Sequence, residues 1–298
     1  MKSFKILKMA LLSFLSVSLF VSCSDDDNNS SQVTDEFEAL NVTTFKTITE
    51  GNYTLDFATK SGELIQGYNE IYIRVKDNRT SEYIDNATIN WVPTMHMTMM
   101  EHQTAKSDVK RTINTTAVYN GYIMFQMAET TDPKQTWTLK VDYTIDGNNY
   151  SEEFDISVPA SARKRVNVIT GTNDKKYYVA LVEPSDPVVG ENELTVAVFM
   201  PESTTSYPIV EDYTLLIDPR MPDPGMGNHG SPNNIDLTYN STTGFYHGKV
   251  NFTMTGLWNL NFQLEDTDGN IVAGEEITNT TNPEGSGYRS SLYLEVEF

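Results

Sequence analysis

The chain has 298 residues, with 41 Asp and Glu side chains against 21 Lys and Arg, so its formal net charge at pH 7 is −20. A surface this acidic is repelled by phosphate, which argues against nucleic acid as a partner and only weakly favours a cation. The single cysteine, Cys23, excludes a disulfide within the chain, so the hydrophobic core has to stabilise the fold.

The N-terminal segment has the pattern of a signal peptide. Lys2, Lys5 and Lys8 precede an apolar stretch with serines over residues 9–22. This stretch is shorter than the roughly twenty residues that a membrane span needs, so we expect residues 1–22 to be removed. Their removal takes away three lysines and leaves 18 basic against 41 acidic side chains, a formal charge of −23.

Cys23 follows the apolar stretch directly and resembles the lipobox cysteine of bacterial lipoproteins, which is acylated and becomes the new N-terminus. Leu19 lies one place earlier than usual, a departure that the looser lipoboxes of Bacteroidetes tolerate. Residues 24–27, Ser-Asp-Asp-Asp, resemble the acidic signal by which those bacteria export lipoproteins to the surface. The resemblance implies a lipid anchor at Cys23 in the outer membrane, on the cell surface. The alternative is a plain solvated acidic tail.

Beyond the anchor, residues 23–36 are mostly Ser, Asn and Asp, which is typical of a flexible tether. The chain then changes to short runs in which large apolar residues alternate with others, as in half-buried strands. Such runs occur at residues 70–75, 137–141, 194–198 and 260–264. We find no convincing amphipathic helix, so the sequence predicts an all-β fold.

Three motifs recur in the same order along the chain. Residues 119–127 match residues 246–254 with identical spacing, Trp137-Thr138-Leu139 matches Trp258-Asn259-Leu260, and Asn69 matches Asn192. The period of roughly 120 to 127 residues is the size of a whole domain. The sequence therefore predicts two tandem immunoglobulin-like β-sandwich domains, residues 37–160 and 166–298, joined by a polar linker.

Methionine and histidine gather at one place in each copy, over residues 91–102 and 221–229, and near the repeated Tyr-x-Gly and Phe-x-Met elements. All four histidines of the chain belong to this pattern. The candidate ligands are Met95, His96, Met97, Met99, Met100, His102 and Met127 in the first copy, and Met221, Met226, His229, His247 and Met254 in the second.

Thioether and imidazole side chains together suit copper, because the first is a soft neutral donor and the second a borderline one. Calcium would need six to eight oxygen ligands, and zinc normally recruits thiolates or several histidines with a carboxylate. Cu(I) is favoured over Cu(II). The alternative is that methionine fills gaps in the core, which is the interpretation we prefer for Met124 and Met200.

If residues 95–99 form one extended strand, alternation places Met95, Met97 and Met99 on one face. His96, together with Met100 and His102 further along, would then lie on the other face. The first face would be a row of thioethers, and the second would be either core or a further set of ligands.

The order of a Met- and His-bearing loop, then Gly-x-x-x-Phe-x-Met, then Trp-x-Leu resembles the YtkA-like and FixH-like β-sandwich domains of exported bacterial proteins, which are associated with copper handling. The resemblance is strongest over residues 221–264, and the first copy lacks the glycine and proline of the loop. It implies a surface-anchored protein that captures, buffers or delivers copper, with an outer-membrane transporter as a partner.

Other functions fit the sequence less well. No histidine stands in a nucleophile arrangement and no Gly-rich phosphate loop follows a strand, so we expect no enzyme. The main alternative is a glycan-binding or adhesive surface lipoprotein without a metal site, in which Trp91, Trp137 and Trp258 would be platforms for sugars. Trp137 and Trp258 lie in alternating runs and are more easily interpreted as core. A structural spacer is the third possibility.

Overall fold

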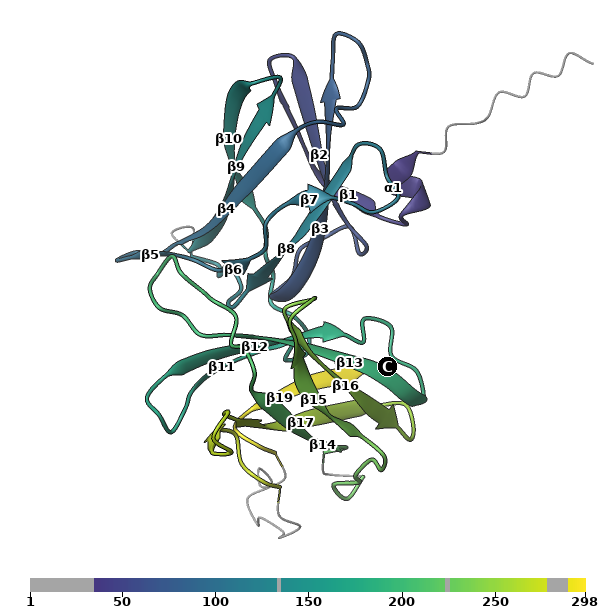
Figure 1. Ribbon diagram of the computed structural model, residues 1–298, viewed down its shortest axis with the longest axis vertical. Coiled ribbons are helices and arrows are strands. Elements are labelled where there is room, and N and C mark those ends of the chain that lie inside the picture. Colours follow the sequence, from purple (N-terminus) through teal and green to yellow (C-terminus); the bar gives the residue numbers. More distant parts are fainter. Residues whose placement is uncertain (1–34, 133–134, 223–225, 278–288) are drawn as a thin grey trace, which may run out of the picture. The chain divides into compact units, whose positions relative to one another are not determined.

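The computed structural model describes residues 35–132, 135–222, 226–277 and 289–298, and Asp35–Phe298 form one compact unit (Figure 1). The predicted signal peptide, the lipidation site Cys23 and nearly all of the tether lie outside the described residues. Among the residues that are described, no helix is long and apolar enough to cross a membrane.

The first half of the unit forms two antiparallel sheets. One sheet has the order β1-β2-β3-β8-β6, with β7 also paired to β8, and the other has the order β10-β9-β4-β5. The elements are α1 (Glu36–Ala39), β1 (Thr43–Glu50), β2 (Tyr53–Thr59), β3 (Gly67–Asp77), β4 (Thr88–His96), β5 (Glu101–Gln103), β6 (Ala105–Lys106), β7 (Lys110–Arg111), β8 (Val118–Phe125), β9 (Thr136–Ile145) and β10 (Asn148–Ile156).

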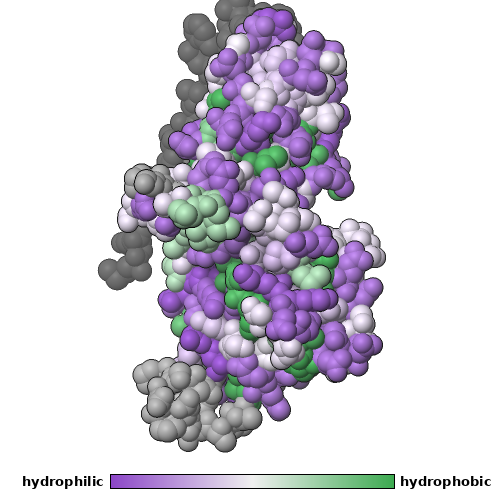
Figure 2. All heavy atoms as spheres, turned by 90° about the vertical axis from the view of Figure 1, so that its left-hand side faces the viewer, coloured by the Kyte–Doolittle hydropathy of each residue, from purple (hydrophilic) through white to green (hydrophobic). Residues whose placement is uncertain are grey.

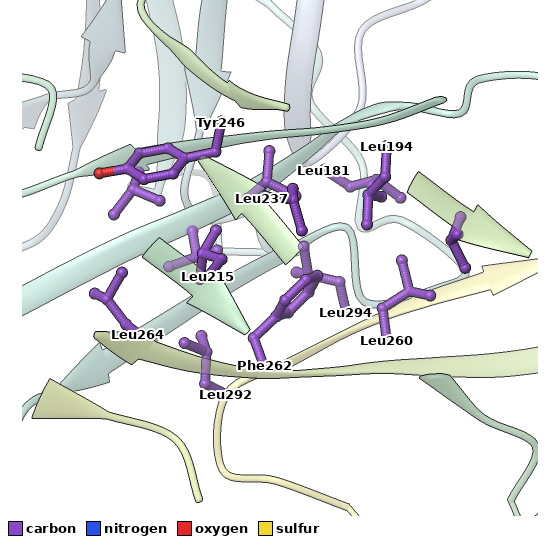
Figure 3. Close-up of a cluster of buried hydrophobic side chains, with 14 of the residues drawn as sticks. Leu181, Leu194, Leu215, Leu237, Tyr246, Leu260, Phe262, Leu264, Leu292 and Leu294 are labelled. Atoms are coloured by element: carbon purple, nitrogen blue, oxygen red, sulfur yellow. The ribbon is translucent and has the colours of Figure 1, made fainter. Parts of the chain in front are cut away.

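The second half forms a nine-stranded sheet with the order β11-β12-β13-β16-β15-β14-β17-β18, in which β19 also pairs with β17. Its strands are β11 (Val166–Thr170), β12 (Lys176–Glu183), β13 (Gly190–Phe199), β14 (Thr214–Arg220), β15 (Ile235–Asn240), β16 (Phe245–Phe252), β17 (Leu257–Glu265), β18 (Ile271–Ala273) and β19 (Tyr293–Glu297). Figure 3 shows leucines from β13, β14, β17 and β19 pointing toward one another, so these strands enclose a common core.

The alternating pattern of the sequence explains how the strands build these cores. In β9, every second residue from Trp137 to Ile145 is buried, and the residues between them are only partly buried. The buried set packs against residues of the other sheet, such as Leu55 and Ile73, in one apolar cluster. The face drawn in Figure 2 is largely hydrophilic. The prediction of an all-β sandwich fold is confirmed.

The matched asparagines, Asn69 and Asn192, make the same hydrogen bonds in the two halves. Asn69 accepts a hydrogen bond from the Ile65 amide (2.9 Å) and donates to the carbonyls of Ile65 (2.8 Å) and Gly67 (2.9 Å). Asn192 makes the same three bonds, with Val188 four positions earlier and with the carbonyl two positions earlier. The repeat in the sequence therefore corresponds to a repeat in local structure, while the exact domain bounds stay a prediction.

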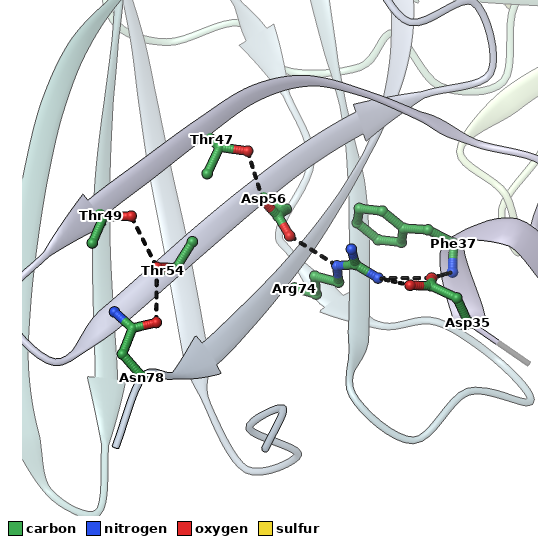
Figure 4. A network of polar contacts seen from close by, with 8 residues as sticks. All are labelled: Asp35, Phe37, Thr47, Thr49, Thr54, Asp56, Arg74 and Asn78. Carbon is green, nitrogen blue, oxygen red and sulfur yellow. Dashed lines mark hydrogen bonds and ion pairs between the residues drawn. The ribbon is translucent and has the colours of Figure 1, made fainter. Parts of the chain in front are cut away.

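The first described residues are held to the first half by Arg74 (Figure 4). Its guanidinium binds both oxygens of Asp35 (2.7 and 2.9 Å) and one oxygen of Asp56 (3.0 Å). It also lies over the rings of Phe37 and Tyr83, 4.1 and 4.6 Å from their centroids. Asp35 in turn caps α1 by accepting the Phe37 amide (2.8 Å). Arg74 thus fixes the point at which the chain enters the fold.

Candidate functional site

The methionine-rich run of the first half folds into a hairpin. β4 ends at His96, the Met97 amide donates to the carbonyl of Met100 (3.0 Å), and β5 returns so that Met95 and His102 are cross-strand partners. Cross-strand partners share a face of the sheet. The sequence analysis placed His102 on the other face of a single strand from Met95. That prediction is wrong, because the chain reverses between the two residues and brings them to the same face.

The hairpin brings His102 to a methionine that is distant in sequence. The imidazole Nε2 lies 3.3 Å from the thioether Sδ of Met127, which follows β8. The edge of the His102 ring packs on Trp137, with ring centroids 5.7 Å apart and planes at 85°. Nδ1 lies 2.8 Å from the carbonyl of Gln103 and 2.9 Å from the amide nitrogen of Gln126. The ring is thus fixed on three sides, with Nε2 aimed at the sulfur.

This arrangement suits a soft cation in the tautomer in which His102 Nδ1 carries the ring proton and donates it to the Gln103 carbonyl. In that tautomer the Gln126 side chain meets the ring through its amide oxygen, because an amide nitrogen cannot donate to a protonated Nδ1. The lone pair of Nε2 then faces the lone pairs of the Met127 sulfur. First-row metal bonds are about 2.0 Å to imidazole nitrogen and 2.3 Å to sulfur, so a single ion can contact both atoms across 3.3 Å. A backbone carbonyl on the remote nitrogen is the usual partner of a ligating histidine.

The other methionines of this hairpin lie in different surroundings. Met95 is fully buried in the core, and Met97 is half-buried against it. Met99 and Met100, at the tip of the hairpin, are 92% and 51% exposed. Of the thioethers predicted as ligands in the first half, Met127 is the one whose sulfur lies within hydrogen-bonding distance of a histidine nitrogen among the described residues.

His96 belongs to the opposite face of β4. Its Nδ1 lies 2.8 Å from a carboxylate oxygen of Glu101, and its Nε2 lies 2.9 Å from the hydroxyl of Thr138. That hydroxyl donates to Glu153 (3.1 Å). Both ring nitrogens of His96 are therefore occupied by polar partners, and the ring is not grouped with His102.

The second half repeats the frame around a buried tryptophan. The indole NH of Trp137 donates to the carbonyl of Met127 (3.1 Å), and that of Trp258 donates to the carbonyl of Met254 (3.0 Å). A histidine ring lies near each indole, since His229 is 6.4 Å from Trp258. The matched motifs of the sequence thus place a histidine and a methionine at equivalent positions beside each indole.

The second group is more exposed than the first. The His229 Nε2 lies 3.2 Å from the hydroxyl of Thr253, and its amide donates to the carbonyl of Met226 (3.1 Å). Met226 and Met254 are 39% and 38% exposed. Met221 instead lies in the core of the second half. Three residues of this loop, 223–225, lie outside the described residues.

His247 is separate from this group. His247 is on β16, and its ring lies between the hydroxyls of Thr195 on β13 (3.2 Å) and of Thr243, which precedes β16 (2.7 Å). Met254 comes seven residues later, which is about 23 Å along an extended strand. Within the described part of the chain, no three His, Cys, Asp or Glu side chains gather as a metal site, so any soft-metal site here depends on the thioethers.

Two residues next to the histidines were missed by the sequence analysis. Gln126 and Thr253 each contact the local histidine ring, and each is the middle residue of a repeated Phe-x-Met element. The duplication could have identified both residues, because the middle position of the Phe-x-Met element carries a polar side chain in each copy.

The three indoles proposed as platforms for sugars are fully buried: Trp91, Trp137 and Trp258. None of them can stack on a ligand from solvent, so the glycan-binding alternative loses that support. Met124 is also fully buried, as expected for a packing residue.

Among solved structures, the chain is similar to the Escherichia coli adhesin FdeC, with 12% identity, a TM-score of 0.26, and coverage of 76% of this chain and 62% of that one. A DUF4785 family protein from Legionella pneumophila gives 12% identity, a TM-score of 0.25, and coverage of 74% and 55%. The chain thus spans less than two thirds of both proteins. A conserved domain protein from Bacillus anthracis gives 11% identity, a TM-score of 0.29, and coverage of 86% and 90%.

No curated protein matches the chain. One protein family does match part of it: the YtkA-like family model covers residues 171–263. This stretch contains Met226, His229, Met254 and Trp258, the residues of the second group.

Proposed function

We propose that the protein binds copper, as Cu(I) in preference to Cu(II), at a histidine–methionine site in each half of the fold. The observation that carries the proposal is the 3.3 Å separation between His102 Nε2 and Met127 Sδ. Soft thioether and borderline imidazole donors favour Cu(I) over hard cations, and they need no cysteine that an oxidising exterior would attack.

The second site consists of His229, Met254 and Met226. It is supported by the matching contacts of Trp137 and Trp258 with the methionine carbonyls. Its residues lie in the stretch that matches the YtkA-like family. Because the side chains of this group are more exposed, we expect it to exchange copper with solution more readily than the first.

The biological role that we propose is capture, buffering or delivery of the ion at the outer face of the cell, without catalysis. The chain would be anchored in the outer membrane through acylated Cys23, and an outer-membrane transporter would receive the ion. Replacing Cys23 by Ser tests the anchor: the wild-type chain is expected in the membrane fraction and the variant in the soluble fraction. A variant that stays with the membrane would contradict it.

The test of the metal site is a competition titration of Asp35–Phe298 with Cu(I) against a chromogenic chelator. We expect the wild-type protein to withdraw two ions. His102→Gln and Met127→Leu should each weaken one of them by at least about tenfold, about 1.4 kcal/mol. The matched control is His247→Gln, which removes a histidine outside both groups and should change neither affinity.

The outcomes separate the alternatives. A wild-type protein that withdraws no copper at micromolar concentration would reject the proposed function. Equal affinities for His102→Gln, His247→Gln and the wild-type protein would show that any copper binds elsewhere. Loss of the second ion in His229→Gln alone would assign that ion to the second site.

A further inference from the structure

The hairpin of β4 and β5 carries a row of thioethers on the same face as His102. Met95 is the cross-strand partner of His102, and the bond from the Met97 amide to the Met100 carbonyl continues the pairing past the end of β4. Side chains alternate between the two faces of a strand, and directly opposite residues share a face. Met97 and Met100 therefore lie on the face of Met95 and His102.

The methionines of this row become more exposed toward the tip of the hairpin. Met95 is fully buried, Met97 is half-buried, and Met100 is 51% exposed. Met99, in the turn, is 92% exposed, the highest value among the exposed large apolar side chains that the structure describes. A methionine that fills a gap in a core is covered by its neighbours, so packing does not explain Met99 and Met100.

At its sheltered end the row reaches the proposed copper site. Met97 and Met127 pack against the same apolar cluster, in which Met95 is buried. Met97 is the diagonal neighbour of His102 across the two strands, a relation in which the residues are about 7–8 Å apart and long side chains can meet. Met100 lies two residues before His102 on the same face. An ion can thus contact the donors of this face one after another.

The donors at the two ends of the row differ in freedom. The His102 ring is held by Trp137 and by the Gln103 carbonyl, so it cannot turn outward to meet an incoming ion. Met99 and Met100 have unbranched side chains with three rotatable bonds, and both extend into solvent. The tip is therefore suited to capturing a soft ion, and the sheltered end to holding it.

We propose that Cu(I) enters and leaves the first site through the tip of this hairpin. The ion binds first to Met99 and Met100, and then passes to Met97 by exchange of one sulfur for the next. It comes to rest between His102 and Met127. No electron and no proton is transferred, because each step replaces one neutral donor by another. This inference rests on the proposed function, since it assigns a route to the copper site described above.

The test is stopped-flow transfer of Cu(I) from its bicinchoninate complex to Asp35–Phe298 carrying His229→Gln, which is expected to bind only the first ion. The double substitution Met99→Leu and Met100→Leu should slow loading at least about fivefold. Return of the ion to excess chelator should slow by the same factor, because residues of an entrance change both rates and leave their ratio unchanged. The equilibrium affinity should change by less than about twofold.

Met95→Leu is the matched control, because Met95 lies on the same face but is fully buried opposite His102, and it should change neither rate. Unchanged rates in the double variant, or equal slowing by Met95→Leu, would overturn the route and leave the copper site standing. An affinity that falls together with the rates would show that Met99 or Met100 holds the resting ion, which also overturns the route. A wild-type protein that takes up no copper would reject the proposed function itself.

Discussion

His102 and Met127 are 25 positions apart, yet the imidazole Nε2 and the thioether Sδ face each other at 3.3 Å. The contact depends on the reversal of the chain after His96 and on the position of Met127 directly after β8. It also depends on Trp137, which packs on the imidazole and binds the Met127 carbonyl. The same indole therefore positions both donors.

Met127→Leu should separate metal binding from stability. Leucine fills nearly the same volume, so the change in the free energy of unfolding should stay below about 1.5 kcal/mol. Copper binding at the first site should nevertheless fall, because the soft donor is lost. Urea denaturation and the Cu(I) competition titration on the same preparation measure both quantities. Met99→Leu is the control, since Met99 is 92% exposed at the hairpin tip and should alter neither.

The strands were predictable from the sequence, and the site was predictable only in part. Alternation fixes the face of residues such as Trp137 and Leu139, because a strand repeats every two residues. The reversal between His96 and Glu101 was not predictable, because the intervening Met-Thr-Met-Met contains no Gly, Pro, Asn or Asp to mark a turn. His247 was grouped with the loop by its place in sequence, but an extended strand carries it far from Met254.

Arg74→Gln should destabilise the protein by about 2 kcal/mol. The substitution leaves Asp35 and Asp56 without their cation, and a partly buried ion pair costs less to break than a fully buried one. Urea denaturation of the wild-type protein and of Arg74→Gln measures the difference in the free energy of unfolding. Lys140→Gln is the control, because Lys140 and Asp142 are 45% and 40% exposed in their pair, and exposed pairs contribute under about 1 kcal/mol. Equal effects of the two substitutions would contradict the role of Arg74.

The same ion pair gives a prediction about pH. The hydrogen bond from Arg74 holds the pKa of the Asp35 carboxyl below its ordinary value. A carboxyl with a lowered pKa stabilises the fold above its unfolded pKa, about 3.9 for Asp, and that stability is lost as the pH falls through the folded pKa. The stability difference between the wild-type protein and Arg74→Gln should therefore be constant from pH 5 to 7 and shrink below about pH 4. A difference that grows on acidification would contradict this assignment.

Gly248, in the repeated Tyr-x-Gly element, should be intolerant of a side chain. A Cβ at this position would meet the carbonyl oxygen of Ile235 and lie 2.9 Å from a side-chain carbon of Leu237. Its counterpart Gly121 is equally crowded, with the carbonyl oxygen of Asp108 and the ring of Trp91 both 2.8 Å away from a Cβ. Because backbone atoms cannot yield as flexible side chains do, the two motif glycines are required by close packing.

Gly248→Ala should consequently lower the free energy of unfolding by about 2 kcal/mol or more, since neighbouring strands must move apart. Gly230→Ala is the matched control: its Cβ would find only the Arg220 side chain, at 3.5 Å, which is ordinary van der Waals contact. Its effect should stay within about 0.5 kcal/mol. Thermal and urea denaturation of the two variants measure both changes in the free energy of unfolding. If both alanines cost the same, close packing would not explain why glycine recurs in the motif.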